Sequence, residues 1–539
     1  MNIEIISKFD LIWRACEQRM SEVYPAGVPA EVGARYEKEI DALTRSNYIE
    51  HLYIYFLLAS AAEAKGFPLY GRGTLMGSLL YFLLGHGRFN PMPAHYYCPH
   101  CGHYEFVPGH GYGVDLPEKT CPECGRKIWA DGYGIPKESV WGIDGKKSIA
   151  FDFNIAKDFR PIAEKVLREA YPDREVVAKG GFTYRGEDEE EHVVPVGFII
   201  LPQGMTIKDG KAMEYLHGLE NGEACLIGNP NKMEKLGMIS ISLIDHEGLD
   251  QLYKLGWKHK VDLDLLGVQM FKKVGWRDIY DYVDLSEAAE RLFMECKPQS
   301  FREMVNLEAL SHATLADGET DEVEIPDACV ELMRSDEFKR CPLYAREDVF
   351  DYLMDPDGEE CERAYDAMEA FRKGWFSNPK RIEERTELLL PTDLECTASH
   401  FRYVFPRAHA VEYMMMYARL AWVKLLDKAT DDVTTDIIAS VVSDYFELDK
   451  EDVLSAKRSP EYVLPRQVIM YFCKEIMDAS YEDIASLFDK QYQDEILEGC
   501  SIIKAFMAPG EKNLYKELEF MERRILGKSN KMHHEEVWQ

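Results

Sequence analysis

Hydrophobic and polar positions follow two different periods along this chain. Residues 1–66 have helical spacing, and the pattern predicts two helices, the second over the apolar run at 48–64, which ends near Gly66 and Pro68. The apolar face of the first predicted helix is formed by Ile12, Trp13, Cys16 and Met20.

From residue 69 to 202 the pattern changes to short apolar runs separated by Gly and Pro. We expect strands at 148–154 and 194–202, a helix at 157–170 and one further strand at 260–268. These elements predict a mixed sheet.

Beyond residue 280 nearly every segment returns to helical spacing, so the predicted fold class is α+β. Breaks in the helical pattern fall near Pro326, Pro342, Pro379 and Pro391. Residues 529–539 are polar and are expected to form a flexible tail.

Composition narrows the class of protein. The 539 residues are 46% hydrophobic and 29% charged, as in ordinary globular proteins of three or four domains. The N-terminus carries acids where a signal peptide is basic, and the apolar stretch 410–426 contains Glu412, Arg419 and Lys424, which favours a buried helix over a membrane span. We expect a cytoplasmic protein without membrane contact.

The net charge of −32 argues against unspecific binding to nucleic acid, which depends on clustered Lys and Arg, although a local basic groove stays compatible with it. Nine of the thirteen cysteines stand alone and are expected to be small buried hydrophobes: Cys16, Cys225, Cys296, Cys329, Cys341, Cys361, Cys396, Cys473 and Cys500.

The remaining four cysteines form two Cys-x-x-Cys pairs separated by nineteen residues: Cys98, Cys101, Cys121 and Cys124. Two such pairs suit the tetrahedral preference of Zn²⁺. His95, His100 and His103 are close enough in sequence to replace a thiolate, but four cysteines already complete a closed site. A closed site leaves no position for water, so the predicted zinc is structural.

The segments around these cysteines resemble the catalytic core of PolC-type DNA polymerase III alpha subunits over residues 70–430. The matching segments are GRGTLMGS (71–78), NPMPAHYYCPHC (90–101), DLPEKTCPECG (115–125), DGYGIP (131–136), FDFN (151–154), VPVGFIILP (194–202), VDLDLLG (261–267), SFREMVNLEALSHAT (300–314), REDVFDYLM (346–354) and FRYVFPRAHAVEYMMMYARLAWVKL (401–425). The resemblance implies a polymerase palm with a zinc module, followed by a helical region like the thumb and fingers.

In that family three palm Asp residues hold two Mg²⁺ ions for nucleotidyl transfer. Asp152 matches the second and Asp264 the third, but the first position is Ala150, which cannot ligate a cation. Asp262 is a possible substitute, and Asp144 is nearby in sequence. Mg²⁺ is therefore expected only if polymerase activity is retained.

Further differences point in the same direction. After 151–154 and again after 261–267 the chain is shorter than the family, where much of the nucleotide-gripping fingers lies, and no exonuclease, PHP or clamp-binding region is visible. The Gly-rich loop is kept, and the resemblance assigns nucleotide binding to Arg72, Gly73, Gly77 and Ser78. Arg72 alone is equally compatible with a solvated turn residue.

Residues 435–528 resemble a different family, the C-terminal helix-turn-helix domain of the replication initiator DnaA. The matching landmarks are DYFELDKEDVLSAKRS, PRQVIMYFCKE (465–475) and SYEDIASLF (480–488). In that family the second helix enters the DNA major groove. The resemblance assigns DNA contact to Arg458, Arg466 and Gln467.

The segment that should begin the recognition helix has changed, however. It reads DKQYQDE (489–495), with Asp494 and Glu495 where the family has threonines, and carboxylates repel phosphates. Residues 435–528 contain nineteen acidic and twelve basic residues, whereas such modules are usually basic.

The sequence divides into a helical region (1–68), a palm-like domain with its zinc module (69–300, zinc module 90–135), a helical region (301–430), the DnaA-like domain (435–528) and the tail. We expect a DNA-replication protein that is catalytically inactive and binds other replication proteins. The alternatives are an active DNA polymerase and a DNA-binding accessory to replication initiation. We interpret His409, in an apolar helix, as a packing residue.

Overall fold

The computed structural model describes residues 3–46, 48–85, 88–109, 111–145, 147–185, 190–219, 222–258, 274–316, 325–354, 360–431, 433–455, 457, 459–488, 493–506, 517–518, 521–522 and 524–525. The chain divides into two compact units, Met1–Ala421 and Trp422–Gln539. The predicted strand at 260–268 lies outside the described residues.

Three helices begin the first unit, where the sequence pattern predicted two: α1 (Ile3–Val23), α2 (Ala30–Arg45) and α3 (Ile49–Lys65). The prediction missed α2 because only four of its residues are buried, and one of them is Glu39. On α1 the residues Ile12, Cys16 and Met20 are buried, but Trp13 is 40% exposed, so the predicted apolar face was too wide.

Within the described residues, seven strands form one mixed sheet in the order β1-β5-β10-β7-β6-β9-β8. Their bounds are β1 (Leu69–Gly71), β5 (Asp152–Ile155), β6 (Val176–Arg185), β7 (Glu190–Ile200), β8 (Leu216–Gly218), β9 (Ala224–Leu226) and β10 (Ile239–Asp245). β10 runs parallel to β5, and both β1 with β5 and β10 with β7 are antiparallel. The predicted mixed sheet is confirmed, although β5 begins four residues later than expected.

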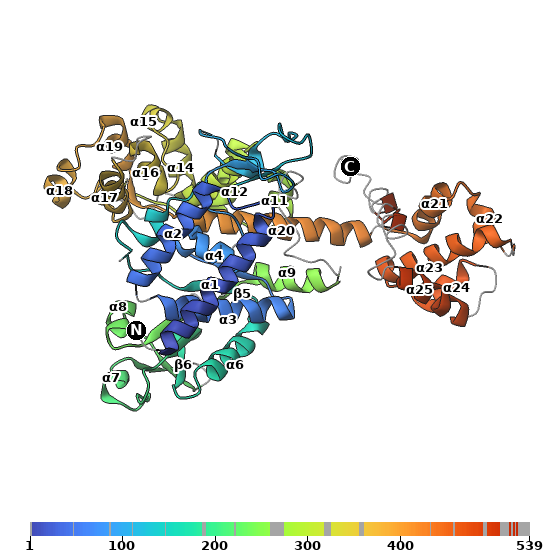
Figure 1. The fold of residues 1–539 in the computed structure, drawn as a ribbon, viewed down its shortest axis with the longest axis horizontal. Helices are drawn as coiled ribbons and strands as arrows, with labels where there is room; N and C mark the ends of the chain where they lie inside the picture. Colours follow the sequence, from blue (N-terminus) through green and yellow to red (C-terminus); the bar gives the residue numbers. More distant parts are fainter. Residues whose placement is uncertain are drawn as a thin grey trace. The chain divides into compact units, whose positions relative to one another are not determined.

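One face of β5 packs against α3. The ring of Tyr55 stacks on Phe153 with centroids 5.3 Å apart, and His51 stacks on Phe151 at 4.5 Å. Beside α3 lies α6 (Arg160–Ala170), which confirms the predicted helix at 157–170 (Figure 1). Because side chains alternate along a strand, Asp152 and Asn154 lie on the opposite face of the sheet.

A second, three-stranded sheet carries the cysteines, in the order β3-β2-β4: β2 (His95–Tyr97), β3 (Tyr104–Phe106) and β4 (Trp129–Asp131). Short helices connect the two sheets and the outer strands: α4 (Leu79–Leu83), α5 (Lys137–Trp141), α7 (Gly210–Met213), α8 (Pro230–Lys235) and α9 (Glu247–Lys258).

The rest of the first unit is mainly helical, as the sequence predicted. Its elements are α11 (Trp276–Tyr282), α12 (Glu287–Cys296), α13 (Phe301–Ser311), α14 (Ile325–Arg334), α15 (Asp336–Arg340), α16 (Glu347–Leu353), α17 (Cys361–Arg372), α18 (Ile382–Thr386), α19 (Thr392–Ala398) and α20 (Arg407–Asp431), with β11 (Thr314–Leu315) and β12 (Phe401–Tyr403) paired to each other. Helices α12 and α13 both begin at a serine whose hydroxyl accepts a backbone N–H two or three residues into the helix.

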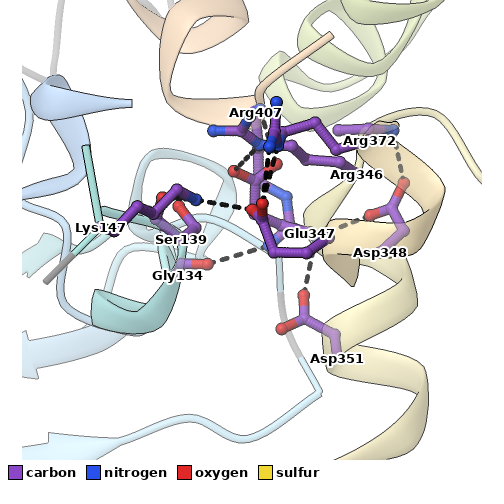
Figure 2. A network of polar contacts seen from close by, with 11 residues as sticks. Gly134, Ser139, Lys147, Arg346, Glu347, Asp348, Asp351, Arg372 and Arg407 are labelled. Carbon is purple, nitrogen blue, oxygen red and sulfur yellow. Dashed lines mark hydrogen bonds and ion pairs between the residues drawn. The ribbon is translucent and has the colours of Figure 1, made fainter. Parts of the chain in front are cut away.

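A buried arginine fixes the start of α20 (Figure 2). The Arg407 guanidinium donates to the Gly134 carbonyl at 2.9 Å and to Asp348 Oδ1 at 2.6 Å, and Asp351 Oδ2 lies 2.7 Å away. The Arg407 N–H donates to Glu347 Oε2 at 2.9 Å. These contacts join α20 to α16 and to the loop after β4.

A second buried ion pair lies in the same network. Lys147 Nζ donates to the Ser139 carbonyl at 2.7 Å and to Glu369 Oε1 at 2.8 Å, and Arg372 binds the other oxygen of Glu369 (Figure 2). Burial lowers the pKa of Lys147 to about 8. α17 is thereby attached to the segment between α5 and β5.

The second unit is helical: α21 (Thr435–Tyr445), α22 (Lys450–Leu454), α23 (Val463–Met477), α24 (Tyr481–Ser486) and α25 (Gln493–Phe506). Its core includes Ile438, Val468, Phe472, Ile484 and Ile496. No helix in the described parts of the chain is both long and apolar enough to span a bilayer.

Glu412 of α20 is the buried acid whose titration should be visible in the stability of the first unit. Glu412 is 2% exposed, and burial raises its pKa from 4.5 to about 7 although Arg88 and Arg419 oppose the shift. Between these two pH values the folded protein holds a proton that the unfolded chain has released, so stability falls as pH rises through this window.

We expect Glu412→Gln to remove this dependence. From pH 4.5 to 7.5 the wild type should lose up to about 3 kcal/mol relative to the variant, measured by urea unfolding at a series of pH values. The exposed Glu287→Gln serves as the control and should follow the wild type. Parallel curves for wild type and Glu412→Gln would contradict the expectation.

Candidate functional site

Four residues from four adjacent strands form one row across the seven-stranded sheet. Asp152 of β5 pairs with Ser242 of β10, Ser242 pairs with Gly197 of β7, and Gly197 pairs with Lys179 of β6. Residues paired in this way project to the same face, with about 4.8 Å between neighbouring strands. The predicted Asp152 therefore shares its face with a serine, a glycine and a lysine.

The lysine side chain crosses the glycine to reach the serine. Lys179 Nζ donates to Ser242 Oγ at 2.6 Å, which is possible because Gly197 has no side chain between them. Burial lowers the pKa of Lys179, while the negative charge of Asp152 acts in the opposite direction. The half-buried Asp152 thus has an ammonium group in its electrostatic environment.

The described residues do not fit the Mg²⁺ pair that the resemblance implies. Ala150 is exposed just before β5 and offers no ligand atom, and the cationic Lys179 acts on Asp152 from the same face. Asp144 is also exposed, and its charge acts on Tyr365 of α17. Asp264 and Asp262 lie outside the described residues, so their roles stay predictions.

Arg72, the predicted nucleotide-binding residue, binds the same face of β5. Its Nη1 donates to Asn154 Oδ1 at 2.8 Å and to the hydroxyl of Tyr413 on α20 at 3.2 Å. Arg72 is therefore a bridge between the sheet and α20.

A stack of rings continues from Tyr413. The ring centroid of His409 lies 4.7 Å from that of Tyr413 and 4.5 Å from that of Phe405. The ring of His312, the residue after α13, lies 4.4 Å from Phe405 between centroids. His409 is 6% exposed, which agrees with its interpretation as a packing residue.

Positively charged side chains act on His409 in this stack. The pKa of His409 is lowered by burial and by the charges of Arg72, His312 and Arg346. Within the part of the chain that the structure describes, Arg346 Nη2 and His409 Nε2 are buried and make no hydrogen bond. Two of these cationic residues already have acidic partners, since Arg346 lies 3.3 Å from Glu347 and His312 lies 3.0 Å from Glu308.

Of the other residues of the Gly-rich loop, Gly77 and Ser78 have packing roles. Gly73 is in the left-handed region with φ 76° and has open space beside it, whereas a Cβ on Gly77 would lie 2.4 Å from Ile135. The buried Ser78 caps α4 and donates to Glu39 Oε2 at 2.6 Å. Nucleotide binding by these residues stays a prediction.

The four predicted zinc ligands converge. The sulfur atoms of Cys98, Cys101, Cys121 and Cys124 all lie within 4.8 Å of one another, and Cys98–Cys124 and Cys101–Cys121 are each 3.5 Å apart. Four thiolates bound to zinc at 2.3 Å are about 3.8 Å apart, so this cluster fits a tetrahedral Zn²⁺ ion. The ion would hold the module together and would leave no open position for chemistry.

The backbone forms the same kind of turn at both Cys-x-x-Cys pairs. The N–H of Gly102 donates to the Cys98 carbonyl at 3.0 Å, and that of Gly125 donates to the Cys121 carbonyl at 2.9 Å. Each glycine follows its Cys-x-x-Cys pair with positive φ, 76° and 71°. A residue with a side chain would be strained in these turns.

The zinc module is tied to distant helices. The Tyr97 hydroxyl accepts from the Ala26 N–H at 2.9 Å in the turn between α1 and α2. The Asp115 carboxylate accepts the Phe301 and Arg302 N–H groups at 2.8 and 2.9 Å, and so caps α13 from outside.

In the second unit the predicted DNA contacts are internal or undescribed. Arg466 is 7% exposed and donates to the carbonyls of Val453 and Ser455, both at 2.6 Å, at the end of α22. Gln467 is half-buried and contacts Gly499 of α25, and Arg458 lies outside the described residues. Arg466 therefore has a structural role.

Sequence reasoning missed Lys179, Arg346 and His312. Arg346 and His312 lie within the segments that carried the resemblance, but only the three-dimensional structure reveals that they approach Arg72. For Lys179 the available signal was a lone lysine in the run VVAKGG, followed by Gly197 in the next strand. That signal requires the strand register, which the sequence does not supply.

Removing zinc should lower the stability of the first unit and leave that of the second unit unchanged. Purified protein should contain about one Zn²⁺ per chain. We expect chelation, or Cys121→Ser, to lower the unfolding temperature of the first unit by several degrees, because the bound metal stabilises only the folded module. Metal content by mass spectrometry and unfolding by calorimetry provide the measurements.

Cys396→Ser, which removes an exposed lone cysteine, is the matched control and should change neither measurement. An unfolding transition that is indifferent to metal removal would exclude the structural role.

Replacing Arg466 should destabilise the second unit. Arg466→Ala leaves buried carbonyl groups without donors, and we expect a loss of about 2 kcal/mol in urea unfolding. Lys450→Ala removes a surface ion pair with Asp436 and should cost less than about 1 kcal/mol. Equal effects of the two substitutions would argue against the internal role of Arg466.

Comparison with known proteins places these features in context. Residues 10–185 match the family model described as bacterial DNA polymerase III alpha NTPase domain, and residues 435–503 match the model described as bacterial dnaA protein helix-turn-helix. The first match begins well before residue 70, so the similarity includes the N-terminal helices.

Several curated proteins are similar to the chain over 76% of its length, all of them named DNA polymerase III PolC-type. The protein of Bacillus subtilis is 27% identical over 465 residues, and those of Thermotoga maritima and Caldanaerobacter subterraneus are 25% identical over 465 and 463 residues. The chain spans 32–33% of the length of these relatives. Both resemblances seen in the sequence are thus confirmed: one part of the chain is similar to DNA polymerase III alpha subunits and another to the helix-turn-helix of DnaA.

Proposed function

We propose that this chain is a cytoplasmic DNA-replication protein that acts as a scaffold or regulatory interaction protein and does not transfer nucleotides. The similarity to PolC-type polymerases and to DnaA supports the replication context, because both named families belong to that process. Its partners would be other replication proteins or DNA. We assign the seven-stranded sheet to the polymerase palm, and the helical region 301–430 to the thumb and fingers.

The row Asp152–Ser242–Gly197–Lys179 is the observation that carries the proposed loss of catalysis. Two-metal transfer requires carboxylates that bridge the two cations and orient the attacking and leaving oxygens. Ala150 supplies no carboxylate, and the cationic group that interacts electrostatically with Asp152 is the ammonium of Lys179. A palm built in this way lacks the ligand pair on which the chemistry depends.

The charges of the second unit support a protein-binding role over recognition of a DNA site. Acids are exposed along α24 and α25, namely Glu482, Asp483, Glu495 and Glu498. Within residues 435–528, every lysine that the structure describes is paired with an acid. The pairs are Lys450–Asp436, Lys457–Asp452, Lys474–Asp478 and Lys504–Glu475. With Arg466 internal as well, little positive charge is presented to a phosphate backbone.

Primer extension tests the proposal directly. The zinc-loaded protein is incubated with a primed template, Mg²⁺ and all four dNTPs, beside the variant Asp152→Ala/Asp264→Ala. We expect no extension by either protein, because the first metal-binding carboxylate is missing. Circular dichroism and metal content confirm that both proteins are folded.

Extension by the wild type that disappears in the variant would overturn the proposal. That outcome would assign the chain as a minimal DNA polymerase in which Asp262 or another acid replaces the missing ligand.

A further inference from the structure

The row across the seven-stranded sheet is a built feature of the fold. Lys179 is separated from Ser242 by the whole width of β7, and the intervening residue has no side chain. That residue is Gly197, and a Cβ there would lie only 2.0 Å from the Ile241 carbonyl oxygen. The backbone of β7 thus requires glycine, and the glycine keeps the path of the lysine open.

The Lys179 side chain is fixed at both of its ends. The backbone of Lys179 is held by its pairing with Gly197, and its Nζ is held by the hydrogen bond of 2.6 Å to Ser242 Oγ. Ser242 in turn is the register partner of Asp152. A cation held so firmly on this face repels any further cation that approaches Asp152.

Within the described residues, no hydrogen bond or ion pair is formed by the Asp152 carboxylate, whose charge instead influences Lys179. A carboxylate of this kind is an attractive ligand for a divalent cation when no other positive charge is near. Lys179 provides such a charge from within the chain.

We propose that Lys179 is a built-in cation that takes the place of a divalent metal ion beside Asp152, and that it prevents Mg²⁺ or Mn²⁺ from binding to this face of the sheet. The inference rests on the proposed function in so far as it treats the sheet as a polymerase palm. It goes further by assigning a second cause, independent of Ala150, for the absence of a metal pair.

The test restores the missing acid with and without the lysine. Binding of Mn²⁺ is measured by electron paramagnetic resonance for the full-length protein and for Ala150→Asp, Lys179→Met, Ala150→Asp/Lys179→Met and Ala150→Asp/Lys179→Arg. We expect the Ala150→Asp/Lys179→Met protein to bind Mn²⁺ at least tenfold more tightly than Ala150→Asp alone. The arginine variant keeps the charge and should behave like Ala150→Asp.

The new site must depend on Asp152. Adding Asp152→Asn to Ala150→Asp/Lys179→Met should abolish the gain, whereas Asp152→Asn in the wild type should change no Mn²⁺ binding. Lys211→Met, which removes an exposed lysine of α7, controls for the loss of one positive charge from the unit.

Two results would overturn the inference: Mn²⁺ binding to the wild type that Asp152→Asn removes, or equally tight binding by Ala150→Asp with and without Lys179. If Lys179→Met fails to fold, Lys179→Gln takes its place, and the wild-type comparison with Asp152→Asn still decides.

Failure of this inference and failure of the proposed function give different results. Primer extension by the wild type that survives Asp152→Ala/Asp264→Ala would refute the proposed function alone, whereas extension that disappears in that variant would refute both, because it requires a metal ion at Asp152. Asp152-dependent Mn²⁺ binding by a wild type that extends no primer would refute the role of Lys179 alone.

Discussion

The first unit depends on one buried arginine at the start of its longest helix. Arg407 contacts three acids of α16 and one carbonyl of the loop after β4. A guanidinium group suits this position because its fixed fork of donors matches several acceptors at once. Removing it would leave the buried Glu347 and the half-buried Asp348 with less compensation for their charges. The direction of α20 is therefore set at its first residue.

The direction of α20 determines which of its side chains face the sheet. His409 and Tyr413 lie one turn apart and form the ring stack, and Tyr413 meets Arg72 above Asn154. The same face of the sheet carries Asp152, on β5 itself, and Lys179 on β6. In the described residues this face presents Arg72 and Lys179 together with the carboxylate of Asp152.

The sequence identified the features that are local and failed where the answer depends on register. The cysteine pairs are readable because each one is a five-residue turn that ends in glycine, as at Gly102. The α+β class and the helical second half follow from periodicity. Helix α2 was missed because it buries so few apolar side chains, and Trp13 was assigned to the core although it faces solvent. Lys179 reaches Ser242 only through the alignment of three strands, which no short stretch of sequence encodes.

The capping of α13 by Asp115 has a thermodynamic consequence. The carboxylate belongs to the zinc module, and the helix that it caps ends near His312, beside the ring stack. Folding of the zinc module and folding of the first turn of α13 are therefore energetically coupled. Linkage between equilibria is reciprocal, so a contact that stabilises the far end of α13 would also strengthen the binding of Zn²⁺ by the four cysteines.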